Sequence, residues 1–293
     1  MSNGLKGALA ALAASTIWGV SGIYFDVLRD VPPFEVLAHR VIWSLVFFLG
    51  LFAVTGRLGE FAGVLRRPRL VALLGLTSLL VAANWLGYIW AIQNGRATEA
   101  SLGYYMFPLM SVALGYVLFR ERFSRAQAIA IGLAALAVVV LTIGLSAAPW
   151  LGVFLAITFS LYGSMKKALP VGPVMSVAVE VAVLAPVVGV WLLVAGSAFG
   201  AGFLITLWLM LSVVFTGLPL VLFSYASKRL AYSSLGLLGY LNPTLQFTVA
   251  MVYFMEPFTG AHAIAFPLIW CGVALYCIDI WRQDRSARIA SRS

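Results

Sequence analysis

Long apolar stretches, separated by short basic clusters or by glycine and proline, run along the whole chain of 293 residues. A helix needs about 20 mostly apolar residues to cross the hydrocarbon core of a bilayer. Two stretches are too long for one helix, and each contains a glycine-rich break, near 144–149 and 196–202, which predicts a tight helical hairpin. The pattern predicts ten membrane-spanning helices, at 5–25, 34–54, 70–92, 97–118, 126–144, 150–165, 174–195, 204–226, 232–255 and 262–281.

The amino-acid composition also indicates a membrane-embedded protein. Hydrophobic residues make up 62% and charged residues 10% of the sequence, whereas soluble domains carry about 25% charged residues. These values exclude an ordinary cytosolic enzyme, a disordered chain and a secreted disulfide scaffold. The first apolar stretch exceeds the 7–15 residues, roughly, of a signal-peptide core, so we expect a retained helix.

The net charge of +9 comes from basic residues that are unevenly distributed along the chain. If the N-terminus is cytoplasmic, 16 of the 19 Lys and Arg residues fall in cytoplasmic segments, two fall in outer loops, and Arg40 lies within a helix. Membrane proteins concentrate Lys and Arg on the cytoplasmic side. The sequence therefore predicts a multi-pass protein of the inner (plasma) membrane with both termini in the cytoplasm, and no nucleic-acid partner.

The two halves of the chain resemble each other. At an offset of 135 residues the fourth predicted helix matches the ninth, and the matched pairs are Tyr105/Tyr240, Pro108/Pro243, Phe119/Phe254, Glu121/Glu256 and Phe123/Phe258. A repeat of five helices enters the membrane from the opposite side the second time, as in many secondary transporters. We expect an all-α membrane protein with two inverted five-helix repeats, 1–145 and 146–281, and a basic cytoplasmic tail, 282–293.

Several segments resemble the RarD branch of the drug/metabolite transporter superfamily. They are Ser-Thr-Ile-Trp-Gly at 15–19, Val-Pro-Pro-Phe-Glu-Val-Leu-Ala-His-Arg-Val-Ile-Trp-Ser at 31–44, Asn-Trp-Leu-Gly-Tyr-Ile-Trp-Ala at 84–91, Ser-Leu-Gly-Tyr-Tyr at 101–105 and Leu-Gly-Tyr-Leu-Asn-Pro-Thr-Leu-Gln at 238–246. The resemblance covers nearly the whole chain. It implies ten helices in two EamA-type repeats and the export of small metabolites or drugs.

Three ionisable residues lie well inside predicted helices: His39, Arg40 and Glu180. A charge at the centre of a bilayer is costly, so each is a candidate for a functional role. We hypothesise that Arg40 holds an anionic group and that Glu180 holds a cation or couples a proton, with His39 as an alternative proton carrier. The competing interpretation is that Arg40 reaches outward to acidic residues and that Glu180 reaches Lys166 or Lys167.

Polar and aromatic residues on the predicted helices are candidates for a substrate pocket. Proline in a membrane helix frees backbone carbonyls, and rings with polar tips suit an amphipathic ligand. The candidate substrate-binding residues besides the three charges are Trp43, Asn84, Tyr88, Tyr104, Tyr105, Tyr240, Asn242 and Gln246. Trp18-Gly19 and Tyr162-Gly163, in matching places of the two halves, are predicted packing points beside the pocket.

These features predict a secondary transporter that moves a small amphipathic metabolite or drug by alternating access, with an amino-acid-like molecule as one candidate. The chain has no Gly-x4-Gly-Lys-Ser/Thr motif, so no ATPase subunit is required. No metal site or cofactor is expected, because only two histidines and two cysteines occur. The predicted partners are a small-molecule substrate, the lipid bilayer and a coupling proton, with oligomeric state left open. A channel or passive facilitator is the main alternative, and an intramembrane enzyme a weaker one.

Overall fold

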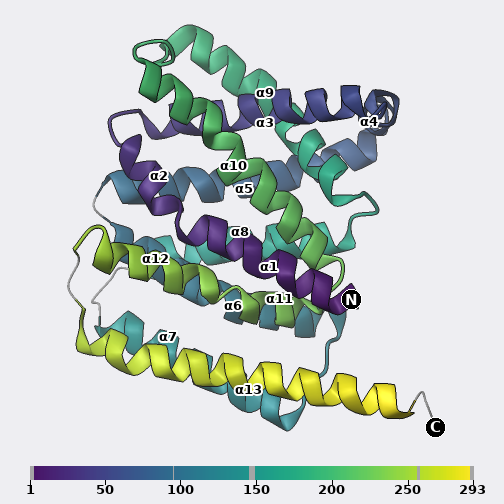
Figure 1. Cartoon of the computed structure of the whole chain (residues 1–293), viewed down its shortest axis with the longest axis vertical. Coiled ribbons are helices and arrows are strands. Elements are labelled where there is room, and N and C mark those ends of the chain that lie inside the picture. Colours follow the sequence, from purple (N-terminus) through teal and green to yellow (C-terminus); the bar gives the residue numbers. More distant parts are fainter. Residues whose placement is uncertain (1–2, 95, 145–148, 256–257, 291–293) are drawn as a thin grey trace.

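The computed structural model describes residues 3–94, 96–144, 149–255 and 258–290, and within them all regular structure is α-helical (Figure 1). The helices are α1 (Asn3–Gly19), α2 (Ser21–Val27), α3 (Pro33–Val54), α4 (Leu58–Leu65), α5 (Pro68–Gln93), α6 (Ala97–Phe119), α7 (Arg125–Gly144), α8 (Pro149–Ala168), α9 (Pro173–Ala195), α10 (Phe203–Ser227), α11 (Tyr232–Leu238), α12 (Leu241–Val252) and α13 (Gly260–Ala290). The predicted all-α class is confirmed.

Each of the ten predicted segments is helical in the structure, and two of them are broken. The first breaks between α1 and α2 after Gly19, and the ninth breaks between α11 and α12 just before Pro243. Among the described residues, seven helical segments are long and apolar enough to span a membrane, and α1 with α2 counts as one of them. The count of ten crossings stays a prediction. Helix α4, within a predicted basic loop, was missed by the sequence analysis.

Proline and glycine explain where several long helices begin and end. Pro33, Pro68 and Pro173 each occupy the first turn of a helix, where the missing N–H leaves no hydrogen bond unmade. After α3 the chain turns at Gly56, whose φ of 68° lies in the left-handed region that glycine adopts without strain.

The helices pack mainly across the two halves of the chain. Helix α3 packs on α9, α6 on α11, and α7 on α13. The packing of α1 on α10 has its counterpart in that of α8 on α5, and α6 on α8 is matched by α12 on α1. Two equivalent halves related by a two-fold axis would produce this exchange. The division into repeats at 145 and 146 itself stays a prediction.

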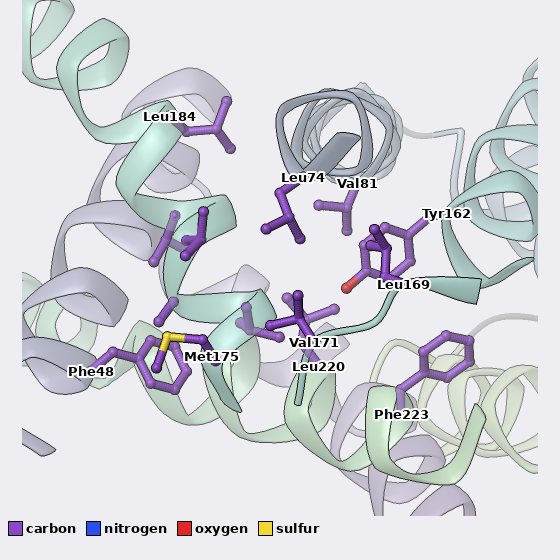
Figure 2. Packing of buried hydrophobic residues seen from close by; sticks show 14 of the residues in the cluster. Phe48, Leu74, Val81, Tyr162, Leu169, Val171, Met175, Leu184, Leu220 and Phe223 are labelled. Carbon is purple, nitrogen blue, oxygen red and sulfur yellow. The ribbon is translucent and has the colours of Figure 1, made fainter. Parts of the chain in front are cut away.

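The largest hydrophobic cluster lies where α3, α5, α8, α9 and α10 meet, and Figure 2 shows Phe48, Leu74, Tyr162 and Leu220 pointing into it. The outside is also apolar: Leu193 is 88% and Phe203 81% exposed. Apolar surface of this kind suits contact with lipid tails rather than water. The start of α1, helix α4 and the end of α13 lie at one end of the bundle, and the α9–α10 connection lies at the other (Figure 1).

Candidate functional site

Arg40 is a buried charge held inside the bundle. Arg40 lies on helix α3 and is 2% exposed. Its Nε donates a hydrogen bond to Thr216 Oγ1 at 2.7 Å, and its Nη2 lies 3.5 Å from the carbonyl oxygen of Phe215. Its guanidinium lies over the ring of Trp85, with Cζ 4.3 Å from the ring centroid. Within the described part of the chain, Arg40 forms no ion pair with a carboxylate. Among the described residues, the positive charge is therefore stabilised by dipoles and aromatic faces.

Arg40 lines a small cavity, which we call the Arg40 cavity. It lies between helices of both halves, α1, α2, α3, α5, α6, α8 and α12. Its lining residues are Trp18, Ser21, Phe25, Arg40, Asn84, Trp85, Tyr88, Tyr104, Phe159, Asn242 and Gln246. A second cavity shares Trp18, Tyr104, Phe159 and Asn242 with it. The Arg40 cavity has a volume of about 20 Å³ within which the centre of a water molecule can lie. This volume is enough for one or two waters. In this conformation the cavity is therefore too small for a metabolite-sized ligand.

The polar groups that line the Arg40 cavity differ in how many of their hydrogen-bonding atoms have a partner. Asn84 donates both amide hydrogens to α8, at 2.8 Å to the carbonyl oxygen of Leu155 and at 3.0 Å to Thr158 Oγ1. Gln246 Nε2 donates to Asn242 Oδ1 at 3.0 Å. The buried indole nitrogen of Trp18 has no acceptor among the described residues. Asn84 consequently joins two helices, while Trp18 offers a donor at the cavity.

Glu180 lies in α9 and does not contact Arg40. Its Oε1 accepts hydrogen bonds from Lys166 Nζ at 2.9 Å and Thr77 Oγ1 at 2.6 Å. Tyr162 Oη lies 3.4 Å from Oε2, and Ser176 also bonds to Lys166. Both charged side chains are buried, at 0% and 2% exposed. Glu180 therefore lies outside the lining of the Arg40 cavity, with Lys166 as its counter-ion, and its role in substrate binding stays a prediction.

His39 and Trp43 face the connection between α9 and α10. His39 Nε2 lies 2.9 Å from Ser197 Oγ, which donates to Glu35 Oε1 at 2.6 Å. Both the His39 and the Trp43 rings pack against Phe199. Neither residue lines the Arg40 cavity, and their role in substrate binding stays a prediction. Trp43 follows His39 by four positions, so the two share a helix face, whereas Arg40 is the next residue after His39 and points about 100° away from it.

Tyr105 and Tyr240 lie in a separate core cluster with α7 and α13. Tyr105 Oη donates to the carbonyl oxygen of Pro243 at 3.3 Å, so the ring joins α6 to α12 rather than facing the cavity. The adjacent Tyr104 lines the cavity instead. Neighbouring residues on a helix point about 100° apart, which separates these two tyrosines. Neither Tyr105 nor Tyr240 lines the Arg40 cavity, and their role in substrate binding stays a prediction.

The two predicted packing glycines lie at very close helix contacts. A Cβ atom at Gly19 would lie 2.5 Å from Leu245 Cβ, and one at Gly163 would lie 2.4 Å from Tyr232 Oη. Trp18 lines the Arg40 cavity, and Tyr162 stacks on Phe159, which also lines it. Glycine permits this approach because it has no side chain.

Sequence reasoning missed Thr77 and Thr216 as partners of the two buried charges. Lys166 was counted in a cytoplasmic cluster with Lys167, yet it is 1% exposed. The competing interpretation of Glu180 did name Lys166 as a partner. The two threonines are distant in sequence from the residues they bond, and no local pattern identifies them.

Comparison with known proteins gives concordant relatives. The EamA-like transporter family matches residues 5–143. Protein RarD of Streptomyces exfoliatus is 38% identical, with 96% of this chain and 91% of the relative covered. An uncharacterized transporter of Pseudomonas aeruginosa is 36% identical over 96% of both chains. Protein RarD of Escherichia coli is 33% identical, over 97% and 98%. A protein of known crystal structure superposes with a TM-score of 0.71 at 22% identity, covering 93% of this chain and 96% of that one.

Proposed function

Because this chain belongs to the EamA-like transporter family and to its RarD branch, we propose that it is a secondary transporter that exports a small amphipathic metabolite or drug by alternating access. It is a multi-pass membrane transporter, and the proposal concerns its substrate, direction and mechanism. The observation that carries the proposal is Arg40: a buried cation without a carboxylate partner among the described residues, in a cavity between the two halves.

Arg40 is proposed to bind an anionic group of the substrate. Keeping a guanidinium out of water is costly unless an opposite charge or strong hydrogen bonds compensate. Thr216 and the ring of Trp85 supply part of that compensation. An anionic substrate would supply the rest and would form bidentate hydrogen bonds with the planar fork. The aromatic lining then packs against the apolar body of the substrate.

Two polar clusters are proposed to close the two ends of the pathway. At one end, Lys166 and Glu180 join α8 to α9. At the other, Glu35 accepts hydrogen bonds from Ser197 Oγ at 2.6 Å and from the backbone N–H of Ala198 at 2.5 Å, and so ties the α9–α10 connection to α3. Opening either end requires one cluster to separate, and the other holds its end shut. Glu180 or His39 is the proposed carrier of a coupling proton.

The end that holds α4 and the end of α13 is proposed to face the cytoplasm of a bacterial inner membrane. Arg57, Arg66, Arg67 and Arg69 flank α4 there. The positive-inside rule then assigns both termini to the cytoplasmic side.

Reconstituted vesicles test the proposal. A thermal-stabilisation screen of small metabolites identifies ligands, since a ligand at 100 times its Kd stabilises the folded protein by about 2.7 kcal/mol. Ligands are then assayed for flux in wild type, Arg40→Ala and Glu180→Gln. Saturable flux that Arg40→Ala abolishes supports the proposal. Flux that rises linearly with concentration would indicate a channel, and undiminished flux in both variants would refute the assigned roles.

A further inference from the structure

The Arg40 cavity carries an unbalanced positive charge, and this restricts the net charge of its ligand. Among the described residues that line it and the adjoining cavity, none is Asp or Glu. Its polar lining beyond Arg40 consists of neutral amides, hydroxyls and the indoles of Trp18 and Trp85. A ligand must therefore bring the negative charge itself.

The described carboxylates nearest in sequence or fold are already engaged elsewhere. Glu180 is paired with Lys166. Glu35 accepts from Ser197 and Ala198 and lies 3.8 Å from His39. Asp26 accepts from Tyr253 Oη at 3.1 Å. None of the three lines the Arg40 cavity or the adjoining cavity.

An ammonium group in this cavity would face a second cation and no anion. Arg40 would repel it, in surroundings of low dielectric where like charges interact more strongly than in water. Aromatic faces attract cations, but Arg40 already lies over those of Trp85 and Phe25. A hydroxyl in the same place would instead donate to an amide oxygen of Asn242 or Gln246, which line the cavity.

From this charge balance we propose that the site selects organic monoanions, namely carboxylic acids with an apolar or aromatic body and neutral substituents such as a hydroxyl, over amino acids of the same shape. The inference rests on the proposed transport function and narrows its substrate class. It replaces the amino-acid-like substrate that the sequence analysis expected. Hydroxy acids and amino acids on one skeleton then differ in affinity by about tenfold or more, because the ammonium group of the amino acid meets a like charge and no counter-ion in the cavity.

Matched ligand pairs test the selectivity. Thermal stabilisation of the purified protein at pH 7 is measured with 3-phenyllactate against L-phenylalanine, and with 2-hydroxyisocaproate against L-leucine. Each pair shares skeleton and carboxylate and differs only in hydroxyl against ammonium. The expected result is tighter binding of both hydroxy acids. Equal or tighter binding of the amino acids, or binding of none of the four compounds, overturns the inference.

A designed carboxylate provides the converse test. Asn242→Asp puts an anion into the cavity and retains an acceptor for Gln246 Nε2. It should shift the preference toward the amino acids by about tenfold. Asn94→Asp, at the exposed end of α5, adds the same charge away from the cavity and should leave the preference unchanged. An unchanged preference in Asn242→Asp refutes the inference.

Flux separates this inference from the proposed function. Saturable flux of amino acids that depends on Arg40 would overturn the inference and leave transport standing. Selective binding of hydroxy acids without flux would support the selectivity of the site and refute transport.

Discussion

The buried ion pair of Lys166 and Glu180 allows a direct test of what stabilises the helix bundle. The change is Lys166→Met, which keeps a long apolar side chain and removes the charge, alongside Glu180→Gln and the double variant. Removing one partner leaves the other charge buried without its counter-ion. Removing both leaves no net charge to compensate.

The magnitudes follow from the geometry. Nζ and Oε1 lie 2.9 Å apart, and at an effective dielectric constant of 20 this separation corresponds to an attraction of about 6 kcal/mol. Desolvation opposes most of that, and breaking a buried pair by deleting one partner costs about 3–5 kcal/mol. Replacing both partners by neutral residues is close to neutral, or about 1–4 kcal/mol stabilising. Thr77, which donates to Glu180 Oε1 at 2.6 Å, would still bond to the glutamine of the double variant.

The assay is thermal unfolding of the four proteins in one detergent at one protein concentration. A loss of about 3 kcal/mol lowers the midpoint by roughly 6–12 °C for a chain of this size. The expected pattern is a large drop in Lys166→Met, partly or wholly recovered in the double variant. If the two single losses simply add in the double variant, the pair is not coupled and the reasoning fails.

Three further predictions concern two other contacts and the topology. Gly163→Ala would place a Cβ 2.4 Å from Tyr232 Oη and should destabilise the protein by about 1–3 kcal/mol, whereas Gly189→Ala in α9, with open space around it, should not destabilise it; equal midpoints for the two would contradict the close contact. Glu121→Ala removes the carboxylate that accepts the N–H groups of Tyr232 and Ser233 at the start of α11, at 2.6 and 3.1 Å, and should lower stability by about 0.5–2 kcal/mol in the same melting assay. In a chain lacking its two native cysteines, Arg66→Cys and Arg285→Cys should both resist an impermeant maleimide in intact cells, and labelling of one alone would refute the proposed topology.

The helices and their lipid environment were predictable from the sequence because they depend on local properties. Runs of apolar residues identify helices whatever their neighbours, and Pro33 and Pro173 mark two helix starts at the predicted places. The family resemblance was also readable along the chain, and the comparisons confirm it. Arg40, Asn242 and Gln246 were singled out as polar residues within helices; they line one cavity, and their binding of substrate stays a prediction.

The partners of the buried charges were decided only by tertiary packing. Arg40 and Glu180 look alike in the sequence, as single charges about six residues inside a helix, yet Glu180 meets Lys166 and Arg40 meets Thr216. Tyr104 and Tyr105 are adjacent, and only the direction in which α6 packs sends one to the cavity and the other to the core. A hydrophobic pattern predicts that a residue is buried. It does not predict which helix from the other half of the chain packs against that residue, and this contact determines whether a buried charge is neutralised or left to bind a ligand.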